Sequence, residues 1–374
     1  MSNITSLRSI ILELPPSCIE FWPANPRYAV VGTYNLERPE TDGETNNTNT
    51  EKASQQRNGS LILIDTNGDE VRILQTLPTP SAILDLHFAP DYQDPIAFAV
   101  ATSTGSISLY HLTDAAATTD KSTHPQIAHV KTYQFFPFDV LITAFSWHPK
   151  VPIFGLSLST GEISLGSMKE PMSSTTVCSH DLEAWTLSFL PNGSGVNSGG
   201  DDSKLIFSEL QENIDEAFSE VEPVFKEPRR LSWSDKNIHG AGVTAILPLM
   251  DVSDDLVLTG SYDDHIRLIE APAVGRRRVL AEANLEGGVW RLKRLDFHDK
   301  NSITLLVSCM HAGTRIVRLS RSNSDDWQFE VLAKFEEHKS MNYGSDCRPA
   351  VGENGCRTFV TTSFYDRLLC LWKF

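Results

Sequence analysis

The stretch LVLTGSYDDHIRLIE, from Leu256 to Glu270, contains the pattern that decides the fold. An apolar strand ends in small residues, an acidic turn follows, and a strand of alternating polarity takes the chain onward. Two further copies have the same order: NSGGDDSKLIFSE from Asn197 to Glu209, and TTSFYDRLLCLWKF from Thr361 to Phe374. Recurrence of one such unit is typical of a repeat protein.

Weaker copies of the unit fill the rest of the chain. They are AVATSTGSISLYH (Ala99–His111), GLSLSTGEISLGS (Gly155–Ser167), LVSCMHAGTRIVRL (Leu306–Leu319) and the split pair AVVGTY (Ala29–Tyr34) with GSLILID (Gly59–Asp65). A short apolar strand precedes six of the units, beginning at Cys18, Ile83, Ile142, Ala184, Val243 and Val289. The spacing is close to the roughly 40 to 45 residues of a WD repeat once loop insertions are added. We therefore predict an all-β protein, a single seven-bladed WD-repeat β-propeller formed by residues 1–374.

The ends of the chain predict how the ring closes. The chain stops at Phe374 after the third strand of the last blade, and the alternating stretch SIILEL, Ser9–Leu14, belongs to no other blade. We expect this N-terminal strand to complete that blade, which removes the exposed sheet edges. Two segments are predicted to lie outside the blades, a disordered polar insertion at about residues 36–58 and an acidic loop at about 209–227.

Charge and composition exclude several classes of protein. The formal net charge of −16 repels phosphate backbones and anionic membranes, so we expect no nucleic-acid or membrane partner. No apolar run approaches the roughly 20 residues that cross a bilayer, and the N-terminus does not resemble a signal peptide. The expected location is cytoplasmic. Six scattered cysteines without a C-x-x-C pair predict free thiols and no metal site.

Some polar residues of the repeats are predicted to be structural. An aspartate six residues before the tryptophan position of a WD repeat bonds within its own blade, and Asp366, Asp263 and Asp201 fit that spacing. His239 and His338, just before innermost strands, are expected to join the same networks. In the sixth blade the count reaches His311 instead of an aspartate, and this residue is interpreted either as a turn histidine or as a candidate acid–base group.

The chain contains no nucleophile elbow, P-loop, zinc-protease helix motif or dinucleotide fingerprint. Several loop motifs that the blades do not require are nevertheless distinctive: GTYNL at Gly32, EAW at Glu183, SGGDD at Ser198, TGSYDDHIRL at Thr259, GGVWRLK at Gly287, CMHAG at Cys309, EEHKSMNYGSD at Glu336 and SFYDRLLCLW at Ser363. In their order and spacing, these motifs resemble the diphthine methyl ester hydrolases of diphthamide biosynthesis.

That resemblance implies a function. Proteins of the family act on elongation factor two and remove the methyl ester from methylated diphthine. The chain is then expected to be a protein methylesterase, a carboxylic ester hydrolase that releases diphthine and methanol. Water is the acyl acceptor, and no cofactor is implied. The partner is elongation factor two carrying methylated diphthine.

Several residues within those motifs are candidate site residues. The substrate has a quaternary ammonium beside its ester, and aromatic faces attract such cations, so the candidate substrate-binding residues are Trp185, Trp290, Tyr343 and Tyr365. The alternative is that these rings only pack between blades. The candidate catalytic residues are His311 as general base, Asp346 as its orienting partner and Arg291 as an oxyanion donor. Ser345 or Cys309 as a nucleophile is the other possibility.

Two other functions remain open. A non-catalytic WD-repeat scaffold for protein–protein assembly is the common use of this fold, since fold alone does not define chemistry. A propeller that binds nucleic acid is the third interpretation, and the negative charge of the chain disfavours it.

Overall fold

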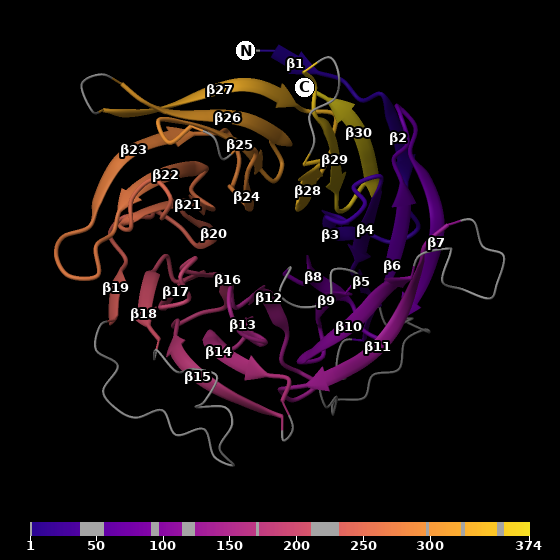
Figure 1. The fold of residues 1–374 in the computed structure, drawn as a ribbon, viewed down its shortest axis with the longest axis horizontal. Coiled ribbons are helices and arrows are strands. Elements are labelled where there is room, and N and C mark those ends of the chain that lie inside the picture. Colours follow the sequence, from indigo (N-terminus) through magenta and orange to yellow (C-terminus); the bar gives the residue numbers. More distant parts are fainter. Residues whose placement is uncertain are drawn as a thin grey trace, which may run out of the picture.

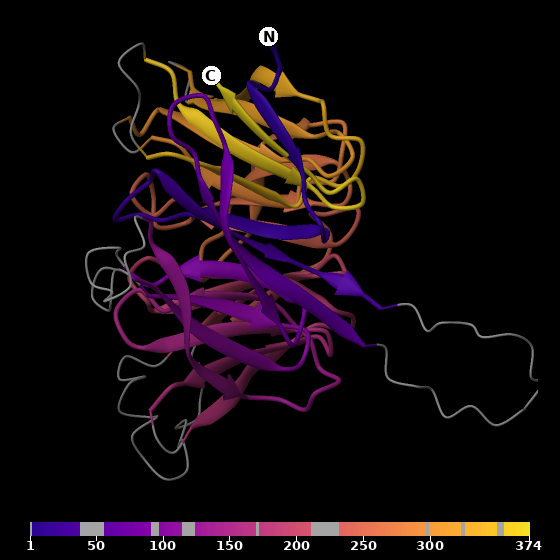
Figure 2. The same ribbon diagram turned by 90° about the vertical axis from the view of Figure 1, so that its right-hand side faces the viewer.

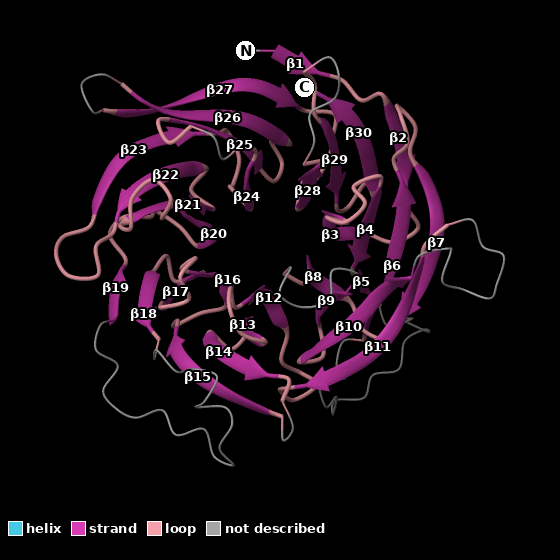
Figure 3. Cartoon of the chain, in the orientation of Figure 1, coloured by secondary structure: helices cyan, strands magenta, loops and turns pink. Residues whose placement is uncertain are grey.

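The computed structural model describes residues 2–37, 56–90, 97–113, 124–169, 172–210, 232–296, 299–322, 326–349 and 355–374. Within these ranges the regular secondary structure consists of β-strands in seven sheets, which stand around one axis (Figure 1; Figure 3). The predicted seven-bladed WD-repeat β-propeller is confirmed.

Four blades are built from consecutive antiparallel strands, the first of which is innermost. Blade 2 contains β8 (Ile83–Phe88), β9 (Ala97–Thr102), β10 (Ser106–Thr113) and β11 (Gln126–Gln134); blade 3 contains β12 (Ile142–Trp147), β13 (Ile153–Leu158), β14 (Glu162–Ser167) and β15 (Ser173–Ser179). Blade 4 contains β16 (Ala184–Phe189), β17 (Gly195–Gly200), β18 (Leu205–Glu209) and β19 (Ser232–Asp235); blade 5 contains β20 (Val243–Pro248), β21 (Leu256–Ser261), β22 (His265–Glu270) and β23 (Arg278–Asn284).

The other three blades include strands from elsewhere in the chain or an additional short strand. Blade 1 contains β3 (Pro16–Phe21), β4 (Tyr28–Thr33), β6 (Arg57–Asp65) and β7 (Arg72–Thr79), with β5 (Asn35–Leu36) paired to β6. Blade 6 contains β24 (Arg291–Arg294), β25 (Ser302–Ser308), β26 (Thr314–Arg321), β27 (Trp327–Phe335) and β1 (Ser2–Ile4); blade 7 contains β28 (Gly344–Cys347), β29 (Thr358–Ser363), β30 (Leu368–Lys373) and β2 (Arg8–Ile11).

The N-terminus closes the ring, as predicted. Strand β2 pairs antiparallel with β30, with Arg8 opposite Leu371 and Ile11 opposite Leu368. The closing strand therefore begins one residue before the predicted Ser9 and ends at Ile11. Strand β1, which was not predicted, pairs in parallel with β27 of blade 6. The first residues of the chain thus connect the last two blades and cover an edge in each.

Small residues on the second strands let neighbouring blades pack closely. A Cβ atom added to Gly260 would lie 2.3 Å from Cγ1 of Val289, and one added to Gly199 would lie 2.6 Å from Cγ1 of Val243. Glycine therefore allows the strand of one blade to contact the start of the next. Fully buried side chains such as Leu258 fill the layer between the sheets, and each contributes about 1.5–3 kcal/mol on burial.

The turn aspartates of blades 5 and 7 accept hydrogen bonds within their blades, as predicted. Asp366 accepts from the hydroxyl of Ser340 at 2.7 Å, and Asp263 accepts from a backbone N–H at 2.7 Å. The two histidines that precede innermost strands are also bonded inside their blades. Nε2 of His239 and Nε2 of His338 each lie 2.8 Å from a threonine hydroxyl of the second strand. These groups stabilise the turns.

The prediction of Asp201 as the structural aspartate of blade 4 is wrong by one residue. The residue that follows Asp263 in blade 5 has a φ of 65°, and Ser203 in blade 4 has a φ of 63°. The residue before Ser203 is Asp202, whose carboxylate lies 2.9 Å from Nδ1 of His180. The structural aspartate is therefore the residue just before the left-handed residue of the turn, and a count back from the third strand does not locate it. Asp201 is left on the surface.

The same criterion corrects the interpretation of His311 in blade 6. Gly313 has a φ of 78°, so Ala312 stands at the aspartate position. The count from Val317 reached His311 because Val317 lies four residues after the left-handed Gly313, whereas Ile269 and Trp372 lie five residues after the left-handed residues of their blades. His311 is an exposed residue of the turn between β25 and β26 and does not replace a structural aspartate.

The two ends of the propeller differ in which loops they present. We call the end that holds the turns between second and third strands the turn face, and the other end the opposite face. Figure 2 shows β5 and β6 extending from the edge-on disc, and their pairing forms the stem of the predicted insertion on the turn face. Most of that insertion, and nearly all of the predicted acidic loop, lie outside the described residues. Among the described residues, no helical segment has the length and apolar character needed to cross a bilayer.

Candidate functional site

A connected series of aromatic rings lies on the turn face, and we call it the aromatic arc. Its members stand at the starts of innermost strands or the ends of second strands, and they are Trp185, Tyr262, Trp290, Tyr343, Phe364, Tyr365 and Tyr34. The arc runs through blades 4, 5, 6, 7 and 1. It unites the four predicted aromatic residues with three that sequence reasoning missed, Tyr34, Tyr262 and Phe364, although all three lie within the family-like motifs.

The rings contact one another in order around the axis. The centroid of Trp185 lies 6.4 Å from that of Tyr262 and 5.9 Å from that of Trp290, which is itself 6.0 Å from Tyr262. Trp290 lies 4.8 Å from Tyr343, and Tyr343 lies 5.6 Å from Phe364. Burial raises the pKa of Tyr343 to about 12, so its phenol is neutral at physiological pH. The arc therefore presents neutral π surfaces on the turn face.

A cavity of about 240 Å³, with charged residues in its lining, adjoins the arc at Tyr343. The innermost strands of four consecutive blades, 6, 7, 1 and 2, line it with charged side chains and with one ring of the arc: Glu20, Asp85, His87, Arg291, Lys293, Asp346 and Tyr343. We call this space the axial cavity. Tyr343 belongs to both features and therefore joins the aromatic arc to the charged groups.

Asp85 occupies the centre of the charged network. It is 3% exposed, and its carboxylate accepts from Nη2 of Arg291 at 2.8 Å and from the backbone N–H of Phe145 at 3.1 Å. Nε2 of His87 lies 3.3 Å from the same carboxylate. Burial would raise the pKa of Asp85, but Arg291 and His87 outweigh that effect and lower it. Asp85 is thus an anion that holds two cations at the cavity wall.

His87 lies between two carboxylates. Its Nδ1 is 2.9 Å from Glu20, and its Nε2 faces Asp85. Partial desolvation opposes protonation of the ring, but Asp85 and Glu20 together raise the pKa of His87 to about 10. At neutral pH His87 is therefore a cation and donates from both ring nitrogens.

Lys293 and Asp346 form the second ion pair of the cavity. The Asp346 carboxylate also accepts the backbone N–H of Phe21 at 2.6 Å and that of Cys347 at 2.8 Å. Desolvation disfavours the Lys293 ammonium, yet the neighbouring carboxylate outweighs this and raises the pKa of the lysine. Asp346 consequently fastens β28 to β3 of the next blade and keeps Lys293 charged.

The structure brings two of the three predicted catalytic residues into one space. Arg291 and Asp346 both line the axial cavity, although each has an ion-pair partner that the sequence did not indicate, Asp85 and Lys293. His311 does not line the cavity. Its imidazole makes no hydrogen bond with any described residue. The predicted constellation of all three side chains is therefore not assembled.

The alternative nucleophiles lack an activating base in the described part of the chain. The hydroxyl of Ser308 donates to that of Ser345 at 2.8 Å, and Ser345 donates to the side-chain oxygen of Asn342 at 3.1 Å. Cys309 is fully buried, which raises its thiol pKa to about 12. A neutral buried thiol is a poor nucleophile.

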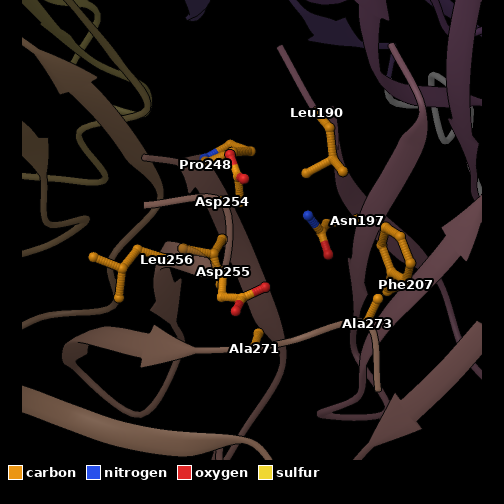
Figure 4. A pocket seen from close by; sticks show the side chains of 10 residues that line it. Leu190, Asn197, Phe207, Pro248, Asp254, Asp255, Leu256, Ala271 and Ala273 are labelled. Atoms are coloured by element: carbon orange, nitrogen blue, oxygen red, sulfur yellow. The ribbon is translucent and has the colours of Figure 1, made fainter. Parts of the chain in front are cut away.

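Two further features of the structure concern ligand binding. A cavity of about 60 Å³ lies at the opposite face between blades 4 and 5, where Asp254 and Asp255 stand near Asn197 and Phe207 (Figure 4). It is large enough for a few water molecules only. Across the described ranges, no three His, Cys, Asp or Glu side chains are grouped as metal ligands.

Fold and site together define a WD-repeat β-propeller with a charged axial cavity and an aromatic turn face. In solved structures the fold is similar to a chain of the mitotic checkpoint complex, with a TM-score of 0.66 and 15% identity over 100% of this chain and 93% of that one. It is also similar to Sqt1 from Chaetomium thermophilum, with a TM-score of 0.62 and 11% identity over the whole of both chains. These likenesses establish the fold alone.

Sequence relatives are more specific, although no protein-family model matches the chain. Diphthine methyltransferase of Schizosaccharomyces pombe is 27% identical over 92% of this chain and 90% of the relative. The protein of the same name in Saccharomyces cerevisiae is 25% identical over 98% and 97%, and the one in Homo sapiens is 26% identical over 92% and 75%. Over most of its length the chain is thus similar to proteins named diphthine methyltransferase.

Proposed function

We propose that the protein acts in diphthamide biosynthesis and hydrolyses the methyl ester of methylated diphthine on elongation factor two. The observation that supports this proposal is the junction at Tyr343, where the aromatic arc meets the charged axial cavity. A substrate with a quaternary ammonium beside an ester requires an aromatic surface and charge-stabilising groups side by side. The names of the relatives direct attention to diphthine.

In the proposed complex the trimethylammonium group lies against Trp290 and Tyr343. The two ring centroids are 4.8 Å apart with an angle of 48° between the planes. A quaternary ammonium cannot donate a hydrogen bond, so it binds chiefly through cation–π attraction to ring faces within about 6 Å. The ester next to it then enters the axial cavity.

Within the cavity, the proposed reaction uses the Glu20–His87 pair for proton transfer. Water attacks the carbonyl carbon as Glu20 takes a proton from it, and Arg291 and Lys293 stabilise the negative charge on the carbonyl oxygen. The C–OCH₃ bond then breaks, and protonated His87 gives its proton to the departing methoxide. Glu20 returns the first proton to His87 across their 2.9 Å hydrogen bond. One water and one ester become one carboxylic acid and one methanol.

This scheme transfers the acid–base role from His311 to the His87–Glu20 pair. The imidazole of His311 is on the exposed rim, whereas the side chain of Glu20, 22% exposed, is on the wall of the axial cavity. Activity that survives His311→Ala would agree with the scheme. Abolished turnover in that variant, with folding intact, would restore His311 as the base.

The test is hydrolysis in ¹⁸O-labelled water. Purified protein is incubated with elongation factor two bearing methylated diphthine, and the modified peptide is weighed by mass spectrometry. We expect loss of one methylene relative to the ester, incorporation of ¹⁸O into the carboxylate and release of unlabelled methanol. Glu20→Gln should lower kcat by about 100-fold or more, while the matched control Glu13→Gln, exposed and outside the cavity, should not.

A second candidate function is methyl transfer to diphthine, which the names of the relatives favour. The same assay separates the two reactions. Methyl transfer would add a methylene mass to unmethylated diphthine when a methyl donor is supplied, whereas hydrolysis removes one from the ester without a donor. If neither mass change occurs, a non-catalytic scaffold is the better description.

A further inference from the structure

Part of the aromatic arc is not used by the proposed reaction. Trp185, Tyr262 and the carboxylate of Asp201 stand together on blades 4 and 5, and we call this group the Asp201 corner. Tyr343 is the ring of the arc that lines the axial cavity; neither Trp185 nor Tyr262 does so. The rings of the corner are therefore available for another ligand group.

Asp201 differs from the other turn aspartates in having acceptor capacity left. Asp202 and Asp263 are occupied by hydrogen bonds within their blades. Asp201 is exposed and accepts the indole Nε1–H of Trp185 at 3.2 Å. Among the described residues, no lysine or arginine forms an ion pair with it. A carboxylate has about four acceptor positions, so Asp201 can still bind a cationic donor.

Gly242 lies close to both Asp201 and Tyr262, and the space between them has no room for a side chain. A Cβ atom on Gly242 would lie 2.9 Å from Cδ2 of Tyr262 and 3.0 Å from Oδ1 of Asp201. The carboxylate and the ring therefore flank the same point on the turn face. A planar cation bound to this carboxylate would also contact the aromatic ring beside it.

We propose that the Asp201 corner binds an arginine side chain of a partner protein. A guanidinium stacks on aromatic faces and donates two parallel N–H groups to a carboxylate, so it uses both components of the corner. A quaternary ammonium uses only the rings, and a lysine ammonium lacks the planar fork. The Asp201 corner is thus a docking contact for the partner protein. It lies beside Trp290 and Tyr343, the rings proposed to bind the trimethylammonium group of diphthine.

The overall charge of the chain favours such a partner. The formal net charge is −16, which attracts a basic protein surface at long range and aligns it before contact. This inference does not depend on ester hydrolysis, because the corner would recognise an arginine even if the protein were only a scaffold.

The test measures binding directly on Trp185. Protein labelled with ¹⁵N at the tryptophan indoles is titrated with N-acetyl-arginine amide, and the Trp185 signal is assigned by its disappearance in Trp185→Phe. We expect a saturable shift with a Kd on the order of millimolar, as for a contact of about 4 kcal/mol. The fully buried Trp372 should not respond. N-acetyl-citrulline amide, which has the same shape without the charge, should cause no saturable shift.

Variants separate this site from general electrostatics. Asp201→Asn should weaken binding about tenfold, the effect of losing one charge-assisted contact. Asp181→Asn, which removes a charge from the same face of blade 4, should change it less than about twofold. Thermal unfolding checks that both variants are folded. Equal binding by N-acetyl-lysine amide, tetramethylammonium or the citrulline compound would overturn the assignment, as would unchanged binding by Asp201→Asn. No ester is present, so failure here leaves the proposed hydrolysis untouched.

Discussion

His87 is a histidine whose surroundings reverse its usual behaviour near neutral pH. Its ordinary pKa of 6.5 is raised to about 10 because Asp85 and Glu20 stabilise the charged ring more than partial desolvation disfavours it. An unfolded chain releases the proton near pH 6.5, whereas the folded protein retains it. The stability that His87 contributes is therefore fully present below pH 6.5 and is lost as the pH rises towards 10.

This linkage predicts how His87→Gln will behave. At pH 6 the variant should be less stable than the original protein by about 1 kcal/mol, a value reduced for the solvent screening of a side chain that is 38% exposed. Near pH 11 the difference should almost vanish, because the imidazole has then lost most of its charge in the folded protein as well as in the unfolded chain. Urea unfolding at the two pH values measures it. A difference that grows with pH would show that His87 is neutral in the folded protein.

Among the structural elements, the four-residue strand β2 closes the ring of blades. It pairs with β30 and continues into Leu12, which is 2% exposed and donates its backbone N–H to Arg367 at 2.8 Å. Leu12 packs in the buried cluster between blades 7 and 1. The chain terminus therefore supplies both a strand and a core side chain to the closure of the ring.

The packing of the closing segment predicts that substitutions at two neighbouring residues will differ in their effect on stability. Leu12→Ala should lower the free energy of unfolding by about 2–4 kcal/mol, since it leaves a cavity in the core. Ile11→Ala removes a side chain that is 69% exposed and should change it by less than about 0.5 kcal/mol. The two variants differ by one position, so comparison of their denaturation midpoints separates burial from strand pairing. Equal midpoints would mean that the closing segment does not pack as described.

The elements also show what could be predicted from the sequence. Repeated strand patterns predict the blades because each blade is a local unit, and SIILEL could be assigned to the closure because no other blade used it. The structural aspartate of blade 4 was missed by one residue, since a left-handed backbone at Ser203 sets the turn. Four rings of the aromatic arc were found because they lie in the motifs, whereas Tyr34, Tyr262 and Phe364 lie in the same motifs and were missed. The ion pairs of the axial cavity were not found, because closure of the ring brings Asp85 beside Arg291, 206 positions later.

On the scale of the whole molecule, the pair of Asp85 and Arg291 connects blades that are not neighbours. Strands β8 and β24 belong to blades 2 and 6, with blades 7 and 1 between them around the ring (Figure 1). The contact between Asp85 and Arg291 therefore depends on the positions of all the blades around the ring. Its formation requires that the axis be closed and the innermost strands be in register.

A double-mutant cycle on this pair tests that arrangement. Arg291→Gln leaves Asp85, 3% exposed, with His87 and a backbone N–H only, and should destabilise the protein by about 2 kcal/mol. Asp85→Asn should have a similar effect, and the two changes combined should cost less than their sum by about 1–2 kcal/mol. Urea unfolding of all four proteins at pH 7 gives the coupling. Strictly additive effects would mean that the guanidinium and the carboxylate do not meet across the axis, and the axial cavity would then have a different lining.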